Sequence, residues 1–229
     1  MKITRKHFLA MGVAGAATAF AGSARGELVE TLQEWHQASF RKAATRPARI
    51  RQVYDITEIN HGVFLNNIKN SLNGFQFGFG LAPREFNVIA ALHGNANLLH
   101  FDDSMWKKYK LGEYAAVTDP RTGSPATRNI FYSAAANPAD KNPDSEKSIY
   151  QDHSIEGLER RNVSFLLCHT ATEEQSRKLK KRLGLAESPE SIVRDLLAHT
   201  IPGSIVVPSM VATVAVLQLQ FHFSYITVA

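Results

Sequence analysis

Cysteine is almost absent from this chain of 229 residues, which contains only Cys168. A single cysteine cannot form an internal disulfide, so we expect no disulfide framework. Cys-x-x-Cys and His-x-x-x-His pairs are also missing, and this argues against a metal site. The chain has no Gly-x-Gly-x-x-Gly, Walker or Gly-x-Ser-x-Gly sequence, so neither nucleotide binding nor serine-hydrolase chemistry is indicated.

Acidic residues are absent from residues 1–26, which hold four of the 26 Lys and Arg residues. The rest of the chain therefore carries 22 basic against 21 acidic residues, a net charge of +1. The positive charge belongs largely to the N-terminal segment and gives no reason to expect a nucleic-acid partner. No long apolar run follows that segment, so we expect no membrane association once it is removed.

Residues 1–26 predict an export signal peptide. A basic start precedes an apolar stretch from Phe8 to Ala21, which is too short to span a bilayer comfortably. Residues 4–9 resemble the twin-arginine export signal, with Lys6 in place of the second arginine. A plain secretory signal or a retained anchor is the alternative. We expect a periplasmic or otherwise exported protein.

The remaining chain is the right length for one domain. Residues 27–50 predict an N-terminal helix, within 27–43, and a linker. Residues 51–229 predict the domain itself, interrupted by an insertion at 113–150 that holds four of the nine prolines. So long an irregular stretch is uncommon inside a compact domain. Two roles for it stay open: an excursion that contacts the protein or another subunit, or a lid over a site.

Strand and helix patterns alternate through the domain. Apolar runs predict strands over 52–56, 86–92, 163–167, 204–207 and 221–228. Helical spacing predicts helices over 62–72, 97–110 and 154–161, and others that begin near Thr170, Pro189 and Pro208. The helix near Thr170 has capping-box spacing and is almost wholly polar, so we expect it at the surface. The alternation predicts an α/β fold: a three-layer α/β/α sandwich with about five mainly parallel strands.

Cys168 is the first candidate site residue. It ends the apolar run 163–167 and precedes a predicted helix, and the carboxyl ends of parallel strands are where ligands and chemistry collect. A helix N-terminus there favours the reactive thiolate, and the neighbouring His169 could contribute. A cysteine at the end of an apolar strand is also commonly a buried core residue, and this alternative stays open.

His93 is the second candidate, because it ends a predicted strand and could lie on the same edge of the sheet as Cys168. It could polarise the thiol or donate to a bound anion. The alternative is a histidine that only satisfies a loop carbonyl. No metal site is predicted, since the remaining possible ligands lack metal-site spacing; these are His100, Asp102, Asp103 and His153.

Four segments resemble the DsrE-like sulfur-relay family in their order and spacing: residues 67–70, 88–94, 163–170 and 205–226. The resemblance implies a five-stranded α/β/α sandwich that forms homo-oligomers. It also implies that Cys168 stands where sulfur-relay members carry a persulfide. The sequence departs from the family at Ser209-Met210, where a glycine is expected, in the 113–150 insertion and in the export signal.

The resemblance implies an exported, sulfur-handling persulfide carrier that uses Cys168 and exchanges sulfur with a donor or acceptor protein. Such a protein is a carrier more than a turnover enzyme, it needs no cofactor, and its thiol must be accessible. A second hypothesis is a module of the same fold that binds a small ligand or cofactor and has a structural, buried Cys168. A third is a non-catalytic oligomeric protein.

Overall fold

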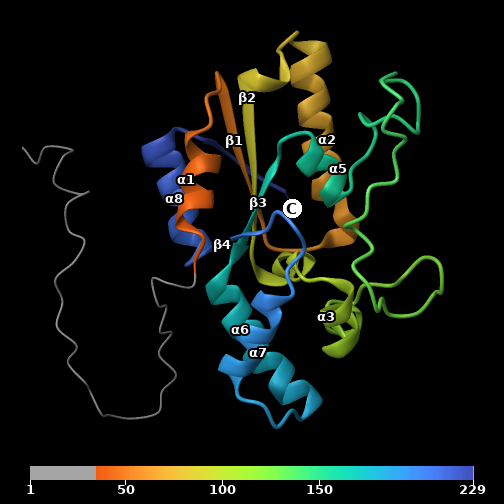
Figure 1. The fold of residues 1–229 in the computed structure, drawn as a ribbon, viewed down its shortest axis with the longest axis vertical. Coiled ribbons are helices and arrows are strands. Elements are labelled where there is room, and N and C mark those ends of the chain that lie inside the picture. The colour runs from red at the N-terminus through yellow and green to blue at the C-terminus, as the bar shows by residue number, and fades with distance from the viewer. Residues whose placement is uncertain (1–34, 229) are drawn as a thin grey trace, which may run out of the picture.

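The computed structural model describes residues 35–228, so the predicted export signal and residues 27–34 lie outside the described range. A five-stranded sheet forms the centre, with strand order β4-β3-β2-β1-β5 and every pair parallel. The predicted α/β sandwich with about five parallel strands is therefore confirmed (Figure 1). The strands are β1 (Ile50–Ile56), β2 (Phe86–Leu92), β3 (Ser164–Cys168), β4 (Ile205–Val207) and β5 (Ser224–Thr227).

Helices cover both faces of the sheet. The helices α1 (Gln37–Thr45) and α8 (Met210–Phe221) lie on one face, and α2 (Val63–Asn73) and α5 (Ile155–Arg160) lie on the other (Figure 1). All seven residues of the central strand β2 are buried. Because side chains alternate along a strand, Ile89 and Ala91 pack toward α1 and α8, whereas residues 88, 90 and 92 pack toward α2.

Three further helices lie beyond the carboxyl ends of the strands: α3 (Asp103–Lys108), α6 (His169–Leu183) and α7 (Pro189–Ala198) (Figure 1). Within residues 35–228 no helix combines the length and the apolar character that crossing a bilayer requires. The carboxyl end of the sheet is thus enclosed by helices, and the chain leaves β3 directly into α6.

The prediction for the helix near Thr170 was wrong in two respects. The helix begins at His169, and its N-cap is Cys168, so there is no capping box at Thr170. Nor does α6 lie wholly at the surface, since Thr172 and Ser176 are fully buried. Their short polar side chains can be buried because each hydroxyl donates to a backbone carbonyl of the helix start.

Other element boundaries also differ from the prediction. The predicted helix over 97–110 is replaced by 3₁₀ turns over Gly94–His100, followed by α3 and the short α4 (Leu111–Tyr114). A new helix starts there because the Asp102 carboxylate caps α3, accepting from the backbone N–H of Ser104 and Met105. Phe221 belongs to α8 rather than to the last strand, since His222 ends that helix in the left-handed conformation.

The stretch between α4 and α5, residues 115–154, contains no regular helix or strand. We call it the excursion. Polar contacts hold it to the domain: buried Asn129 donates to the carbonyls of Leu99 and Phe101. The Asp152 carboxylate accepts from the backbone N–H of Ala135, Ala136 and Ser154. The excursion therefore lies folded against α2 and α5 (Figure 1).

Candidate functional site

Cys168 lies at the carboxyl end of β3, opposite Val207 of β4. Its side chain is on the face of the sheet that α1 and α8 cover, packed in the same apolar cluster as Val53, Met210 and Val214. The residue is only 4% exposed. The expected position at the strand end is thus found, but the thiol is enclosed rather than open on the edge.

Two helix N-termini meet at the sulfur of Cys168. The backbone N–H of Ala171, in the first turn of α6, donates to Sγ over 3.4 Å. The backbone N–H of Met210, the first residue of α8, donates to Sγ over 3.3 Å. Each helix N-terminus carries a partial positive charge, so this arrangement favours the thiolate over the thiol.

Asn97 fixes the backbone at this position. Its Oδ1 accepts from the N–H of Cys168 at 2.9 Å, and its Nδ2 donates to Thr172 and Gln175 at 3.0 and 3.1 Å. Gln175 in turn donates to the carbonyl of Gly94 at 2.6 Å. Sequence reasoning missed Asn97 and Gln175, because nothing in local spacing shows that residues more than 70 positions apart form one buried network.

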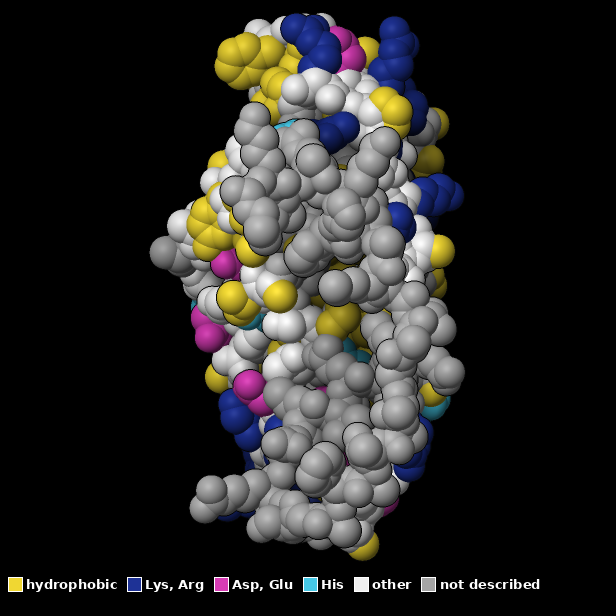
Figure 2. Space-filling view, turned by 90° about the vertical axis from the view of Figure 1, so that its left-hand side faces the viewer, with side chains coloured by type: hydrophobic (Ala, Val, Ile, Leu, Met, Phe, Trp, Pro, Cys, Tyr) yellow, Lys and Arg dark blue, Asp and Glu magenta, His cyan; other side chains and the backbone are white. Residues whose placement is uncertain are grey.

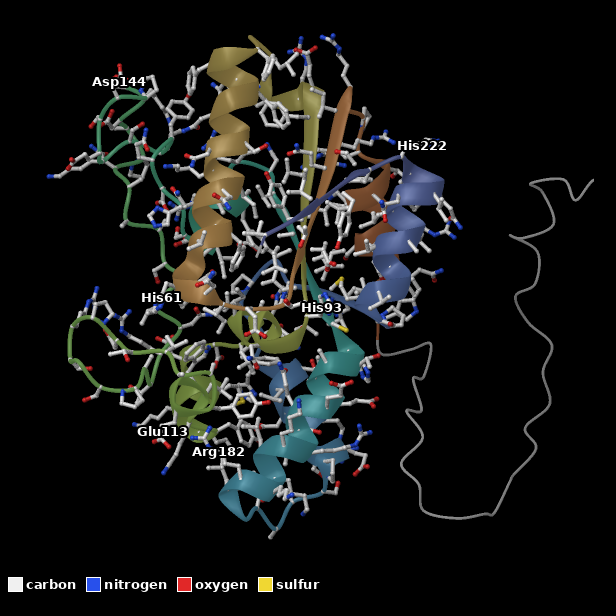
Figure 3. All side chains as sticks on the ribbon, turned by 180° about the vertical axis from the view of Figure 1, so that it is seen from behind. His61, His93, Glu113, Asp144, Arg182 and His222 are labelled. Carbon is white, nitrogen blue, oxygen red and sulfur yellow. The ribbon has the colours of Figure 1, made fainter. Side chains whose placement is uncertain are left out.

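The sheet register places His93 on the strand next to that of Cys168. Leu92 pairs with Leu167 at the end of the ladder between β2 and β3, and His93 continues in extended conformation. Alternation then places the side chains of His93 and Cys168 on the same face of neighbouring strands, which lie about 4.8 Å apart. Figure 3 shows His93 at the end of the sheet, between α8 and α6. Gly94 follows with a φ of 53°, in a turn where a Cβ would come within 2.7 Å of a backbone oxygen.

Two residues that the sequence did not indicate complete this edge. His93 Nε2 lies 2.8 Å from Oδ1 of Asp55 on β1, and Oδ2 of Asp55 accepts from the hydroxyl of Tyr225 on β5 at 2.7 Å. The hydrogen bond from His93 lowers the pKa of Asp55; burial opposes this and the bond from Tyr225 adds to it. Accepting that bond, Asp55 raises the pKa of Tyr225. We call Asp55, His93 and Tyr225 the strand-end trio.

The other sequence candidates lie in different settings. His169 Nδ1 is 3.3 Å from the Glu173 carboxylate, one turn along α6. His100 is buried, bonds Ser204 and the carbonyl of Leu166, and burial lowers its pKa to about 4, so it is neutral at pH 7 and holds the β3–β4 region together. Within the described range, no three His, Cys, Asp or Glu side chains are grouped as metal ligands would be.

A hollow of about 560 Å³ lies between the start of α2 and the excursion, away from Cys168. Leu65, Ile130 and Phe131 supply apolar wall, and His61, Lys147 and His153 are among the polar residues. His61 has a φ of 52°, a left-handed conformation that is uncommon for residues other than glycine. The volume is in the range of small-molecule sites.

No family model, curated protein or solved structure matches this chain. The function is therefore inferred from the chemistry at Cys168, from the hollow beside the excursion and from the resemblance in sequence.

Proposed function

We propose that this protein is an exported, DsrE-like persulfide carrier that works through Cys168. One observation carries the proposal: Sγ accepts two backbone N–H groups, one from the start of α6 and one from the start of α8. Two N–H donors and two positive helix ends at one sulfur stabilise its negative charge and so favour the reactive thiolate. The five-stranded parallel sandwich agrees with the fold that the resemblance implies.

The transfer is a displacement at sulfur. The Cys168 thiolate attacks the outer sulfur of a donor persulfide, R–S–SH, and the donor S–S bond breaks. Cys168 becomes Cys–S–SH, and the donor leaves as the thiolate R–S⁻, so that atoms and charge balance. A donor thiol of low pKa leaves faster. The same steps in reverse pass the sulfur to an acceptor thiol, so one cysteine is enough.

The test is intact mass after treatment with polysulfide under native conditions. We expect the wild-type protein to gain the mass of one sulfur atom, to lose it with dithiothreitol, and to show no gain as Cys168→Ser. Native alkylation by iodoacetamide is the companion test, because the thiol is only 4% exposed. No sulfur gain, together with no alkylation until denaturant is added, would overturn the carrier function.

The hollow of about 560 Å³ supports a second candidate function, the binding of a small organic molecule under the excursion. Its mixed lining suits a ligand with an apolar body and a polar end. A thermal-shift screen of small molecules tests this, with Leu65→Trp as the variant that fills the hollow. A hit whose stabilisation persists in Leu65→Trp would place the ligand elsewhere.

We also propose that the protein associates with itself, through α8. This helix is apolar on nearly all sides, and Val211 and Leu219 are 74% and 79% exposed. Yellow hydrophobic side chains reach the surface on this face in Figure 2. The neighbouring β5 is an edge strand, which can pair with another copy. Light scattering of the wild type against Val211→Glu/Leu219→Glu tests it: an unchanged mass contradicts it.

A further inference from the structure

The strand-end trio is built across three adjacent strands, β2, β1 and β5, with Asp55 in the middle. On one side of His93 lies Asp55 of β1, at 2.8 Å, and on the other side lies the strand that carries Cys168. Tyr225 of β5 bonds the far oxygen of Asp55. The order is thus hydroxyl, carboxylate, imidazole and thiol, read across β5, β1, β2 and β3.

Hydrogen-bond chemistry fixes the roles inside the trio. An ionised carboxylate only accepts, so Nε2 of His93 carries the hydrogen that points to Asp55, which leaves Nδ1 as the nitrogen that can accept a proton. The tyrosine hydroxyl holds the carboxylate from its other oxygen, which keeps Oδ1 facing the ring. A histidine held in this way by a carboxylate is the usual orienting arrangement for a general base beside a nucleophile.

We propose that Asp55 and Tyr225 are positioning residues that hold His93 as the proton acceptor for the Cys168 thiol. The proton moves from Sγ to Nδ1, and the charge of Asp55 stabilises the imidazolium that forms. After the thiolate has attacked the donor, the proton can leave with the donor thiolate. The inference rests on the proposed function only in that Cys168 is a reacting thiol.

Other titratable groups lie on the elements that adjoin this edge of the sheet. On α6 they are His169 and Glu173, which lie 3.3 Å apart, and in the loop after β1 it is Glu58, which accepts from Asn95. Residues 210–221 of α8, which cover this face, contain no titratable side chain. Asp55 is therefore the only carboxylate bonded to His93 in the described range.

The experiment is the rate of Cys168 alkylation by iodoacetamide in the native full-length protein, from pH 5 to pH 10. We expect Asp55→Asn and His93→Gln each to slow the reaction about tenfold at pH 6.5, the effect of one pH unit in the thiol midpoint. At pH 9.5, where the thiol ionises without help, the rates should agree with wild type. The Asp55→Asn/His93→Gln double variant should react no more slowly than either single variant, because both substitutions disable the same proton acceptor.

Tyr225→Phe is the milder variant and keeps the test usable if Asp55→Asn does not fold. Its side chain is 43% exposed, and we expect a slowing of a few-fold at pH 6.5 only. The matched control is Asp195→Asn. Asp195 also accepts from a tyrosine hydroxyl, that of Tyr109 at 2.6 Å, but it lies on α7 away from the sheet. This control should leave the profile unchanged.

Three results would overturn the positioning role: equal slowing at both pH values, additive losses in the double variant, or a thiol that reacts at no pH. The outcome is separable from that of the carrier function. A pH profile that depends on Asp55 in a protein that gains no sulfur from polysulfide supports the trio and rejects the carrier. If the protein takes up sulfur and Asp55→Asn leaves the pH profile of alkylation unchanged, the carrier function is supported and the role of the trio is rejected.

Discussion

Within residues 35–228, an aspartate, a histidine and a tyrosine come together in two places, with similar bonds and different surroundings. The strand-end trio takes one residue each from β1, β5 and the end of β2. The second group, which we call the helix trio, takes Asp195 and His199 from α7 and its end, and Tyr109 from the end of α3. Lys108 also bonds Asp195, at 2.7 Å.

Lys108 limits the chemistry that is possible at the helix trio. Its ammonium neutralises the Asp195 carboxylate, and His199 directs Nδ1 to the carbonyl of Asp195 at 2.8 Å rather than to a reacting group. Among residues 35–228 no lysine or arginine forms an ion pair with Asp55, and the strand next to His93 carries a thiol. The comparison shows that residue types alone do not define a site. The difference lies in the group that the histidine faces besides its aspartate: a strand that carries a thiol for His93, and a backbone carbonyl for His199.

The largest expected effect concerns Asn97, whose buried hydrogen bonds join β3 to α6 and have no counterpart in the helix trio. Asn97→Ala leaves the Cys168 N–H without its acceptor. We expect a loss of about 3 kcal/mol in unfolding free energy, measured with urea. The control is Asn95→Ala, whose hydrogen bond to Glu58 faces solvent, and which should lose under about 0.5 kcal/mol. Equal losses would show that Asn97 is not a structural anchor.

The two tyrosines should differ next. Tyr109 is 3% exposed and Tyr225 is 43% exposed. Removing a hydroxyl from a buried hydrogen bond to a carboxylate costs more than removing one that water can replace. We expect Tyr109→Phe to lose about 1.5 kcal/mol and Tyr225→Phe about 0.5 kcal/mol in urea unfolding. The reverse order would mean that the strand-end trio is there for stability.

The two aspartates should behave alike in stability and differ in chemistry. Hydrogen bonds lower the pKa of both Asp55 and Asp195 relative to the unfolded chain. Their contribution is therefore present above the unfolded pKa and is lost as the pH falls through the folded pKa. At pH 7 we expect each Asp→Asn variant to lose about 1 kcal/mol, and the difference from wild type to shrink as the pH falls through the folded pKa, by thermal melts. Only Asp55→Asn should change Cys168 reactivity at pH 6.5.

The smallest effect concerns a carboxyl that belongs to neither trio. Burial, with Glu156 nearby, raises the pKa of Glu159 to about 7. The folded state then binds more protons than the unfolded state between about pH 4.5 and 7, so stability falls across that window as pH rises. Glu159→Gln should gain roughly 0.5 kcal/mol at pH 8, a small amount because solvent screens part of the charge, and nothing at pH 4. A gain at both pH values would contradict this cause.

Local patterns in the sequence determined the layers of the fold. Apolar runs such as 86–92 and 163–167 must be buried on both faces, so the parallel sheet and its covering helices follow from the order of the elements. The Ser188-Pro189 start of α7 and the strand-end positions of Cys168 and His93 followed in the same way. The sequence patterns gave wrong boundaries where a single residue starts or ends a helix. Asp102 caps the start of α3, and His222 ends α8 in the left-handed conformation.

Only the tertiary structure decided what surrounds the thiol. The second N–H donor comes from Met210, the backbone acceptor from Asn97, and the partners of His93 from Asp55 and Tyr225, all distant in sequence. The alternation of side chains along a strand determines which face of the sheet each side chain lies on. Strand order and register determine which residues of different strands meet on that face. The sequence by itself therefore determined that a cysteine ends a buried strand, and the packing of α6, α8 and four strands decided how enclosed and how polarised that cysteine is.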